Sequence, residues 1–512
     1  MDMEPMPGQD VLRIANCSGF YGDRLSAARE MVEGGPIDVL TGDYLAELTM
    51  AILYKSRARK PETGYATTFV TQMEQMLGAC LAKGIKVVAN AGGLNPAGCA
   101  AAVQAVVDKQ GLKPKIAYIT GDDVLGKLDE WQGAGHALAH LDRGRPLKDL
   151  RAPVVTANAY LGGWGIARAL AQGADVVITG RVTDAALALG PAAWKFGWKR
   201  DDWDRLAAGV VCGHILECGA QCCGGNYSFF QEVPTYTKIC FPVAEMGASG
   251  EFVVTKHPGT GGLVSVGTIT AWGMVGGRER FAEVAVSLRR SDQEDPESNE
   301  AAQALLKITV KDPDAAKVGR AWSNRAIEMA LAHYPGFHMT SPPTEETAYA
   351  VYWPALIPSG MIEQVVHVSG RDIAIPSTMS GGPDMAPALP QSAVIPPAPG
   401  ARTVRAPLGR VAGARSGDKG GNANVGVWAR TPEAYAWLRE FLTAEWLGQL
   451  LPEARGLEVE RYPLPNLLAV NFVIQRLLGE GVSASTRSDP QAKSLGEYLR
   501  ARVVDVPESL LG

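Results

Sequence analysis

Short apolar runs alternate with amphipathic segments from Val11 to Leu189, and this alternation constrains the fold more than any other feature. The expected strands are Val11–Ala15, Ile37–Leu40, Ile85–Ala89, Ile116–Thr120, Val154–Ala157 and Asp175–Thr179, and the expected helices are Asp23–Val32, Asp43–Leu53, Tyr65–Leu81, a helix from Pro96, Ile166–Ala171 and Thr183–Leu189. Strands separated by helices need crossover connections, which make neighbouring strands parallel and place helices over the sheet. We therefore predict an α/β fold, with a mostly parallel sheet and helices on both faces.

The next part of the chain is richer in predicted strands. Alternating segments such as Glu251–Lys256 and Leu263–Ile269 indicate a β-rich extension over about residues 227–372, which completes a large domain of residues 1–375. Helices are expected at Glu300–Lys307 and Ala321–Ala332, and strands at Lys307–Lys311 and Glu363–Val368.

A proline-rich stretch, residues 376–407, has little periodicity and is predicted to be a stiff linker. Beyond it, residues 408–512 are expected to form a small α+β domain. Its predicted strands are Leu408–Ala412, Ala423–Ala429, Leu457–Tyr462 and Leu467–Ile474, and its predicted helices are Pro432–Leu447 and Gln491–Val503. This order suits a ferredoxin-like domain.

Charge excludes one class of partner. The 512 residues carry a net charge of -5, with a pI near 5.9 and no Lys/Arg block, whereas binding nucleic-acid phosphates needs a basic face. The first ten residues contain three acids and neither Lys nor Arg, unlike a secretory signal. The apolar runs are too short to span a membrane. We expect a cytoplasmic protein that handles small molecules.

The eight cysteines do not form a disulfide or zinc pattern, because no CxxC occurs. Cys17, Cys80 and Cys99 stand alone, and the other five gather between residues 212 and 240. The adjacent Cys222 and Cys223 are interpreted as packing residues, since neighbouring cysteines rarely bridge each other.

Polar or glycine-rich loops follow several predicted strands. In an open α/β sheet these loops gather at the edge formed by the carboxyl ends of the strands, where ligands bind. The candidate substrate-binding residues of the loops are Asn16, Ser18, Gly19, Asp43, Tyr44, Asn90, Gly92, Gly93, Asn95 and Asn158, and Arg181 and Asp184 are candidate catalytic residues. Each loop alone is more typical of a tight strand-to-helix turn, but together they predict a cleft.

The segment from His214 to Asn226 carries the most chemistry. In a helix, His214, Glu217, Cys218 and Gln221 lie on one face, and a carboxylate three residues after a histidine can orient the imidazole for acid/base work. A metal site is an alternative that we do not predict, because four ligands at standard spacing are absent. A polar stripe packed between domains is the other alternative.

Two further groups could contact a substrate. Lys256 and His257 flank a glycine-rich turn that could cradle an anion, and Glu245 precedes them with a further carboxylate. In the C-terminal domain, Arg415, Asp418 and Lys419 are expected in a flexible loop, Arg415–Asn422, between two strands. A plain hairpin explains either segment equally well.

Seven strings resemble one family throughout. They are NCSGFYGDR, TGDYLAELTMA, NAGGLNP, GRVTDAAL, GHILECGAQCCGGN, KHPGTGGLVSVGT and ARSGDKGGNANVG. They resemble the acyclic-terpene-utilisation protein A family over about residues 10–275 and 405–505. The resemblance implies a large α/β domain followed by a ferredoxin-like domain. It also implies a role in breaking down branched acids as CoA thioesters, at a hydration or carbon–carbon cleavage step. Cys222–Cys223 and residues 271–274 depart from the family pattern.

These observations favour a lyase or hydratase acting on a branched acyl-CoA or related carboxylic substrate. His214 would be the general acid/base, Glu217 its orienting partner, Asp184 a second acid/base group, and Arg181 and Lys256 partners of an oxyanion or carboxylate. The sequence contains no organic-cofactor motif. The alternatives are a non-catalytic ligand-binding or scaffold subunit, and an ester, thioester or amide hydrolase with Cys218 as nucleophile.

The apolar strand Leu467–Ile474 and three tryptophans further predict a homo-oligomer assembled through the C-terminal domain.

Overall fold

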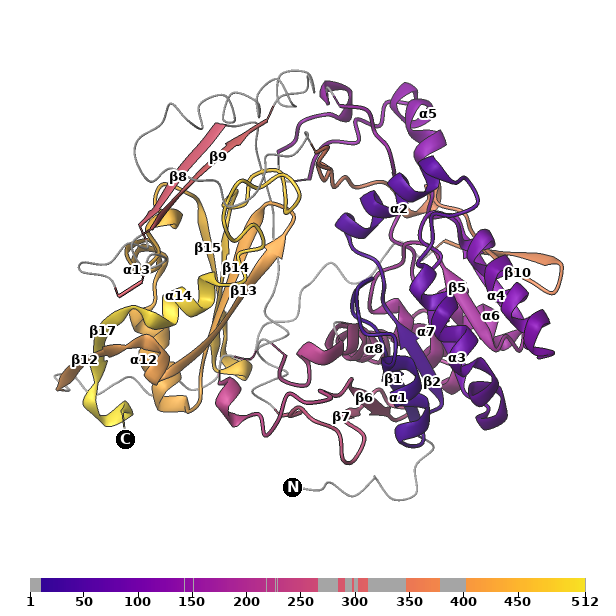
Figure 1. Ribbon diagram of the computed structural model, residues 1–512, viewed down its shortest axis with the longest axis horizontal. Coiled ribbons are helices and arrows are strands. Elements are labelled where there is room, and N and C mark those ends of the chain that lie inside the picture. Colours follow the sequence, from indigo (N-terminus) through magenta and orange to yellow (C-terminus); the bar gives the residue numbers. More distant parts are fainter. Residues whose placement is uncertain are drawn as a thin grey trace. The chain divides into compact units, whose positions relative to one another are not determined.

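The computed structural model describes residues 11–141, 143–150, 152–217, 219–225, 227, 229–265, 284–290, 297–298, 303–311, 347–377 and 402–511 (Figure 1). The chain divides into two compact units. The first contains Met1–Met274 and Trp353–Val394, and the second contains Val275–Tyr352, Ile395–Leu464 and Leu468–Gly512. The predicted helix Ala321–Ala332 and most of the proline-rich stretch lie outside the described residues, as does the larger part of the predicted strand Leu263–Ile269.

The first unit is built on a nine-stranded sheet in the order β11-β10-β4-β5-β3-β2-β1-β6-β7. Its strands are β1 (Leu12–Asn16), β2 (Val39–Gly42), β3 (Lys86–Ala89), β4 (Ile116–Thr120), β5 (Val176–Thr179), β6 (Val243–Met246), β7 (Phe252–Thr255), β10 (Gln364–Val368) and β11 (Arg371–Ile375). The five central strands, β4 to β1, are parallel, whereas β6–β7 and β10–β11 add antiparallel pairs at the two edges. The α/β class is confirmed, but the sheet is mixed, because both edges come from hairpins late in the unit.

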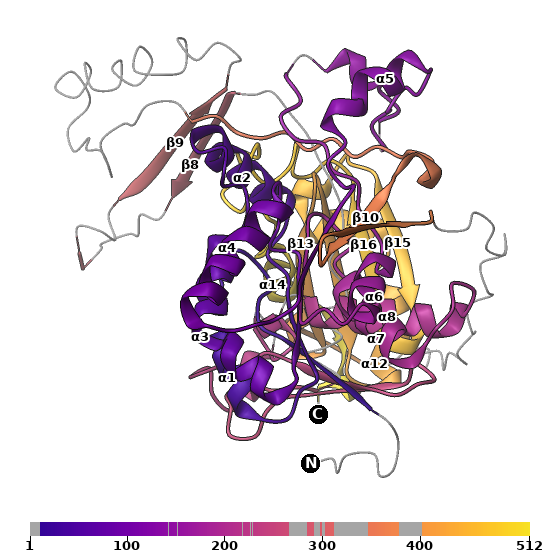
Figure 2. The ribbon, with the colours of Figure 1, turned by 90° about the vertical axis from the view of Figure 1, so that its right-hand side faces the viewer.

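Helices cover both faces of this sheet, because successive strand residues point to opposite sides. Val87 and Val176 pack with α1 (Ala27–Gly34), α2 (Glu47–Arg59), α3 (Thr67–Lys83) and α4 (Pro96–Gln110). Their neighbours Val88 and Val177 pack with α6 (Trp164–Ala171), α7 (Ala186–Phe196) and α8 (Trp203–Glu217). Figure 2 shows α1, α3 and α4 on one side and α6, α7 and α8 on the other.

Two predicted elements of the first part of the chain and its extension are wrong. Val154–Ala157 is irregular rather than a strand, although Asn158 forms an isolated bridge with Asp123. In the second unit, Ala304–Val310 is strand β9, paired with β8 (Val284–Arg290), where a helix was expected up to Lys307. Short apolar segments carry no periodicity that separates helix, strand and irregular chain.

The second unit contains a four-stranded antiparallel sheet in the order β13-β14-β16-β15. Its strands are β13 (Ala412–Lys419), β14 (Asn422–Ala429), β15 (Val459–Leu464) and β16 (Ala469–Ile474), and its helices are α12 (Pro432–Phe441), α13 (Ala444–Leu450) and α14 (Leu495–Ala501). The three helices share one apolar core with one face of the sheet. β12 (Thr403–Pro407), expected as linker, pairs with β17 (Val503–Pro507).

The predicted loop Arg415–Asn422 is wrong, because its residues continue two strands. Arg415, Asp418 and Lys419 belong to β13, and Asn422 opens β14. Two hydrogen bonds of Ser416 help to hold this segment in a regular strand. Its hydroxyl donates to the Ala492 carbonyl at 2.6 Å and accepts from the Gly496 amide at 2.7 Å, which ties β13 to α14.

Candidate functional site

Three carboxylates converge where the parallel strands of the first unit end. Asp43 follows β2, Asp184 lies in the turn after β5, and Glu217 is the last residue of α8. One oxygen of each lies within 4.8 Å of the other two. Because the carboxyl ends of parallel strands share one sheet edge, side chains far apart in sequence meet there.

Asp43 is the buried member of this carboxylate cluster, which we define as Asp43, Asp184 and Glu217. Its Oδ1 accepts from Asn90 Nδ2 at 2.6 Å and from the Leu45 amide at 3.1 Å. Burial, together with the charges of Asp184 and Glu217, raises the pKa of Asp43 well above its usual range, although Arg181 and Asn90 act in the opposite direction. The surroundings of Asp43 therefore disfavour its ionised form.

Arg181 supports the cluster from the loop after β5. Its Nη1 donates to Asp184 Oδ1 at 3.1 Å and to the Leu45 carbonyl at 2.9 Å. Its Nη2 donates to the Tyr160 hydroxyl at 3.1 Å, and the guanidinium stacks on the Tyr160 ring at 4.4 Å. The Tyr160 hydroxyl in turn donates to Glu47 Oε1 at 3.0 Å. The guanidinium is thus committed to protein partners on several sides.

His214 and Glu217 form the predicted pair. His214 Nδ1 lies 3.3 Å from Glu217 Oε1, one turn apart on α8. The Glu217 side chain is 9% exposed and that of His214 is 39% exposed, so the imidazole is the member that solvent or a substrate reaches. Asn16 Nδ2 donates to the Glu217 backbone carbonyl at 3.4 Å and fixes the end of the helix.

A second buried acid, Asp122, holds the backbone beneath the site. Its Oδ2 accepts from the Arg181 amide at 2.8 Å and from Asn158 Nδ2 at 2.8 Å. Burial raises the pKa of Asp122 to about 6, against the opposing effect of these two hydrogen bonds.

The model of the acyclic terpene utilisation family protein AtuA matches residues 12–274 and 273–368, and the model of the AtuA ferredoxin-like domain matches residues 406–505. The chain belongs to the AtuA family. No curated protein and no solved structure matches it. The carboxylate cluster of this AtuA-family protein lies wholly within the first matched region.

The AtuA fold brings together only some of the predicted site residues. Asp43, Asn90, Arg181, Asp184, His214 and Glu217 meet at the cluster, and Asn16 contacts the Glu217 carbonyl behind it. Asn158 lies farther away, where it bonds the Asp122 carboxylate that holds the Arg181 amide. Ser18 contributes its carbonyl, which accepts from the Asp43 amide at 2.9 Å. Cys218 and Asn226 lie outside the described residues, and Gln221 lies in a short 3-10 turn beyond α8.

Other predicted residues are engaged in local structure. The Gly19 amide donates to Asp23 Oδ2, the Gly92 amide donates to the Thr179 carbonyl, and Asn95 caps α4. Gly93 adopts a positive φ of 52° against Leu53. The buried Tyr44 hydroxyl donates to Gln72.

Residues of the β6–β7 region are also tied to the backbone or to a partner. Lys256 Nζ donates to the Thr260 carbonyl at 2.6 Å, and His257 Nε2 lies 2.9 Å from the Met31 carbonyl. Glu245 pairs with Arg13 at 2.8 Å. The turn that was expected to cradle an anion therefore uses its basic side chains for internal contacts.

Sequence reasoning missed Tyr160, Glu47 and Asp122. Tyr160 is two residues beyond the predicted Asn158, and Glu47 is four residues beyond Asp43 at the start of α2, so both lie beside residues that were identified. Their places in the sequence could have identified them, because each lies in a loop or in the first turn of a helix at the same edge of the sheet.

The cysteine interpretation needs one correction. Cys223 forms a disulfide with Cys240, where Cys223 was expected to be a packing residue. The fold places their Cα atoms 6.1 Å apart, within the range that a disulfide spans, although 17 residues separate them in sequence. Cys222 is a buried free thiol, and burial raises its pKa to about 12, which keeps it unreactive.

The carboxylate cluster could also hold a metal. Carboxylate oxygens are the ligands of hard divalent cations, and Asp43, Asp184 and Glu217 each offer one.

Within the described part of the chain, no helix is long and apolar enough to cross a membrane.

Proposed function

We propose that this AtuA-family protein is a lyase or hydratase that acts on an acyl thioester or a related carboxylic substrate. The observation that carries the proposal is the convergence of the buried Asp43, whose pKa is raised, with Asp184, Glu217 and His214. Acid/base catalysis near neutral pH needs a proton donor and a proton acceptor whose environments keep them in opposite states. The cluster offers both within one small site.

The acceptor would be His214. Glu217 beside Nδ1 favours the tautomer that carries its proton on Nδ1, so Nε2 would be the atom that accepts a proton from the substrate. The donor would be the Asp43–Asp184 pair. Two carboxylates that share a site hold a proton between them, and the more exposed Asp184 would deliver it while the buried Asp43 keeps the pair protonated.

These two groups suffice for either reaction. In a hydration, His214 takes a proton from water, the oxygen adds to the β-carbon of an unsaturated thioester, and the carboxyl pair gives its proton to the α-carbon. In a carbon–carbon cleavage, His214 takes the proton of a β-hydroxyl group, the bond between the α- and β-carbons breaks, and the pair protonates the carbanion that leaves. Each route uses one acid and one base.

The charge balance favours an uncharged reacting group. Glu47 and Asp184 lie beside Arg181, whose guanidinium already bonds Asp184, Tyr160 and the Leu45 carbonyl. A free carboxylate would meet repulsion from the acids and would have to displace these partners. A thioester carbonyl or a hydroxyl group avoids both costs.

The test is to incubate the purified protein with a panel of CoA thioesters and follow the products by mass spectrometry. We expect the gain or loss of one water, or two shorter products, from at least one thioester. His214→Ala should lower turnover by about 10²–10⁴-fold, as expected for loss of a proton carrier. His136→Ala, outside the cluster, is the matched control. Thioester binding without any product would instead favour a ligand-binding subunit.

A further inference from the structure

Four basic residues stand within six positions at the end of α2, and we call them the basic run. They are Lys55, Arg57, Arg59 and Lys60, all exposed, in a chain whose net charge is -5. A helix favours cations in its last turn, but Lys55 lies before that turn and Lys60 after it. The helix dipole therefore does not account for the whole run, and such a concentration of positive charge attracts anions such as phosphates.

Arg57 holds this end of α2 on the sheet edge that carries the carboxylate cluster. Its Nη1 donates to the Leu94 carbonyl at 2.8 Å and lies 3.8 Å from Asp123 Oδ2. Leu94 follows β3 and Asp123 follows β4, so both belong to loops at the carboxyl ends of the parallel strands. Among the described residues, Arg59 and Lys60 have no acidic partner, so their charges remain available to a ligand.

The other end of α2 lies at the carboxylate cluster itself. Glu47, the first residue of the helix, accepts from the Tyr160 hydroxyl at 3.0 Å, and its Oε1 lies 3.8 Å from Arg181 Nη2. Arg181 in turn donates to Asp184 of the cluster at 3.1 Å. The helix therefore extends from the carboxylate cluster to the basic run.

One exposed face of α2 changes from apolar to basic between these ends. Leu48 and Ile52, each 45% exposed, share this face with Lys55 and Arg59, because the four residues are spaced four, three and four apart. A helix rises about 1.5 Å per residue, so Arg59 lies about 18 Å along α2 from Glu47. The apolar side chains thus lie nearer the cluster and the basic ones farther from it.

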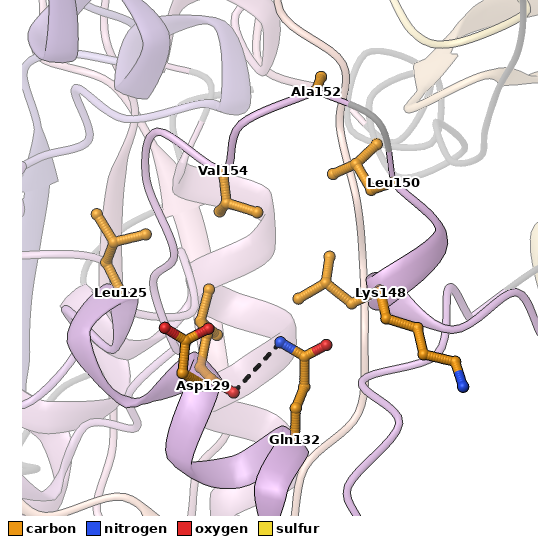
Figure 3. Close-up of a pocket in the computed structure, with 9 residues that line it drawn as sticks. Leu125, Asp129, Gln132, Lys148, Leu150, Ala152 and Val154 are labelled. Atoms are coloured by element: carbon orange, nitrogen blue, oxygen red, sulfur yellow. Dashed lines mark hydrogen bonds between the residues drawn. The ribbon is translucent and has the colours of Figure 1, made fainter.

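A hollow between β4 and α6 is a poorer place for phosphates. Lys148 and Asp129 are among the residues that line it, but Figure 3 shows that the amine of Lys148 points away. The charge of Asp129 would repel an anion there. The basic run offers the opposite charge.

We propose that this face of α2 binds the coenzyme A part of a thioester substrate, with the nucleotide phosphates on the basic run and the thioester at the carboxylate cluster. The arm between the sulfur and the first phosphate of coenzyme A contains about a dozen single bonds and spans on the order of 15 Å when extended. That length suits the distance along α2. The two methyl groups of the arm would pack on Leu48 and Ile52, and Arg59 and Lys60 would pair with the phosphates. The position of the thioester rests on the proposed function, whereas binding of the nucleotide is measured separately.

The test uses adenosine 3′,5′-bisphosphate, a fragment of coenzyme A without the arm, with its affinity for the full chain measured by isothermal titration calorimetry. The double variant Arg59→Gln with Lys60→Gln should weaken binding about tenfold, because it removes two charges that pair with phosphates. Lys113→Gln with Arg405→Gln removes one exposed lysine and one exposed arginine elsewhere, and should keep the wild-type affinity. Added salt should weaken binding by the wild type.

The outcomes separate this inference from the proposed reaction. Equal affinities in the two double variants would overturn the nucleotide site, as would a wild type that does not bind the bisphosphate. A wild type that sediments with phosphatidylglycerol vesicles and does not bind the bisphosphate would assign the basic run to a membrane surface instead. Binding that only the α2 variant weakens supports the nucleotide site even where no thioester is turned over, a result that would count against the lyase or hydratase alone.

Discussion

The backbone amide of Arg181 donates to Asp122 Oδ2 at 2.8 Å, so a buried carboxyl fixes the residue that supports the carboxylate cluster. Asn158 Nδ2 bonds the same oxygen. Asp122 thereby aligns two loops, the one after β4 and the one after β5, although it does not contact the cluster acids through any of these bonds. Its position gives the first two predictions.

Asp122→Asn should remove a pH-dependent loss of stability. Because the pKa of Asp122 is raised to about 6 in the fold, the folded chain binds one more proton than the unfolded chain between about pH 4 and pH 6. The free energy of unfolding therefore falls by about 3 kcal/mol as the pH rises through that window. Denaturant unfolding across this range should show a flatter profile for the variant. The exposed Asp108→Asn should keep the wild-type slope.

Gly180→Ala should destabilise the first unit. A Cβ at Gly180 would lie 2.4 Å from both carboxylate oxygens of Asp122, and its two hydrogen bonds prevent that carboxylate from moving away freely. We expect a loss of about 1–3 kcal/mol, the usual cost of overpacking. Gly133→Ala, which meets nothing within 4 Å, is the control and should leave stability unchanged within about 0.5 kcal/mol or raise it. Equal effects at the two positions would contradict this account of Gly180.

Asp43→Asn should lower turnover without lowering the stability of the fold. The amide oxygen can still accept from Asn90 and Leu45, so the local structure should persist. Since the raised pKa of Asp43 makes its ionised form unfavourable in the fold, the neutral variant should unfold at a higher temperature above neutral pH. Turnover of a thioester substrate should fall about 10²–10⁴-fold. A variant that is less stable than the wild type at high pH would contradict a raised pKa for Asp43.

The Cys223–Cys240 disulfide should make stability depend on reductant. Closing a loop of about 17 residues stabilises a folded chain by about 3 kcal/mol in the loop-entropy treatment. Dithiothreitol should therefore lower the thermal unfolding temperature of the wild type. Cys240→Ser should start at the lower temperature and show no response to the reductant. A wild type that is indifferent to dithiothreitol would mean that the bond adds no stability.

The sequence could predict the central strands, because each is a short apolar run followed by a loop and a helix. It could also predict that the loops after β2, β3 and β5 meet, since parallel strands share an edge; that brings Asp43, Asn90 and Arg181 together. The pairing of His214 with Glu217 followed from helical spacing alone.

The remaining features depend on contacts between distant segments. Nothing local in Gln364–Val368 indicates that this strand pairs with β4, and nothing in Cys240 indicates Cys223 as its partner. Val154–Ala157 has a strand-like composition, yet it stays irregular, with hydrogen bonds to the loop of Asp122–Val124 on one side. Tyr160 reaches the site because the segment that precedes it follows this irregular course.

The pairing of β4 with β10 also has a consequence during synthesis. The outer edge of β4 is complete once Thr120 has left the ribosome, but its partner Gln364–Val368 follows about 240 residues later. At typical rates of translation of about 5–20 residues per second, that edge stays unpaired for on the order of ten to fifty seconds. An unpaired strand edge is a template for association with other chains. Unfinished chains are therefore expected to associate through this edge, and nonsense products that stop before residue 375 should aggregate.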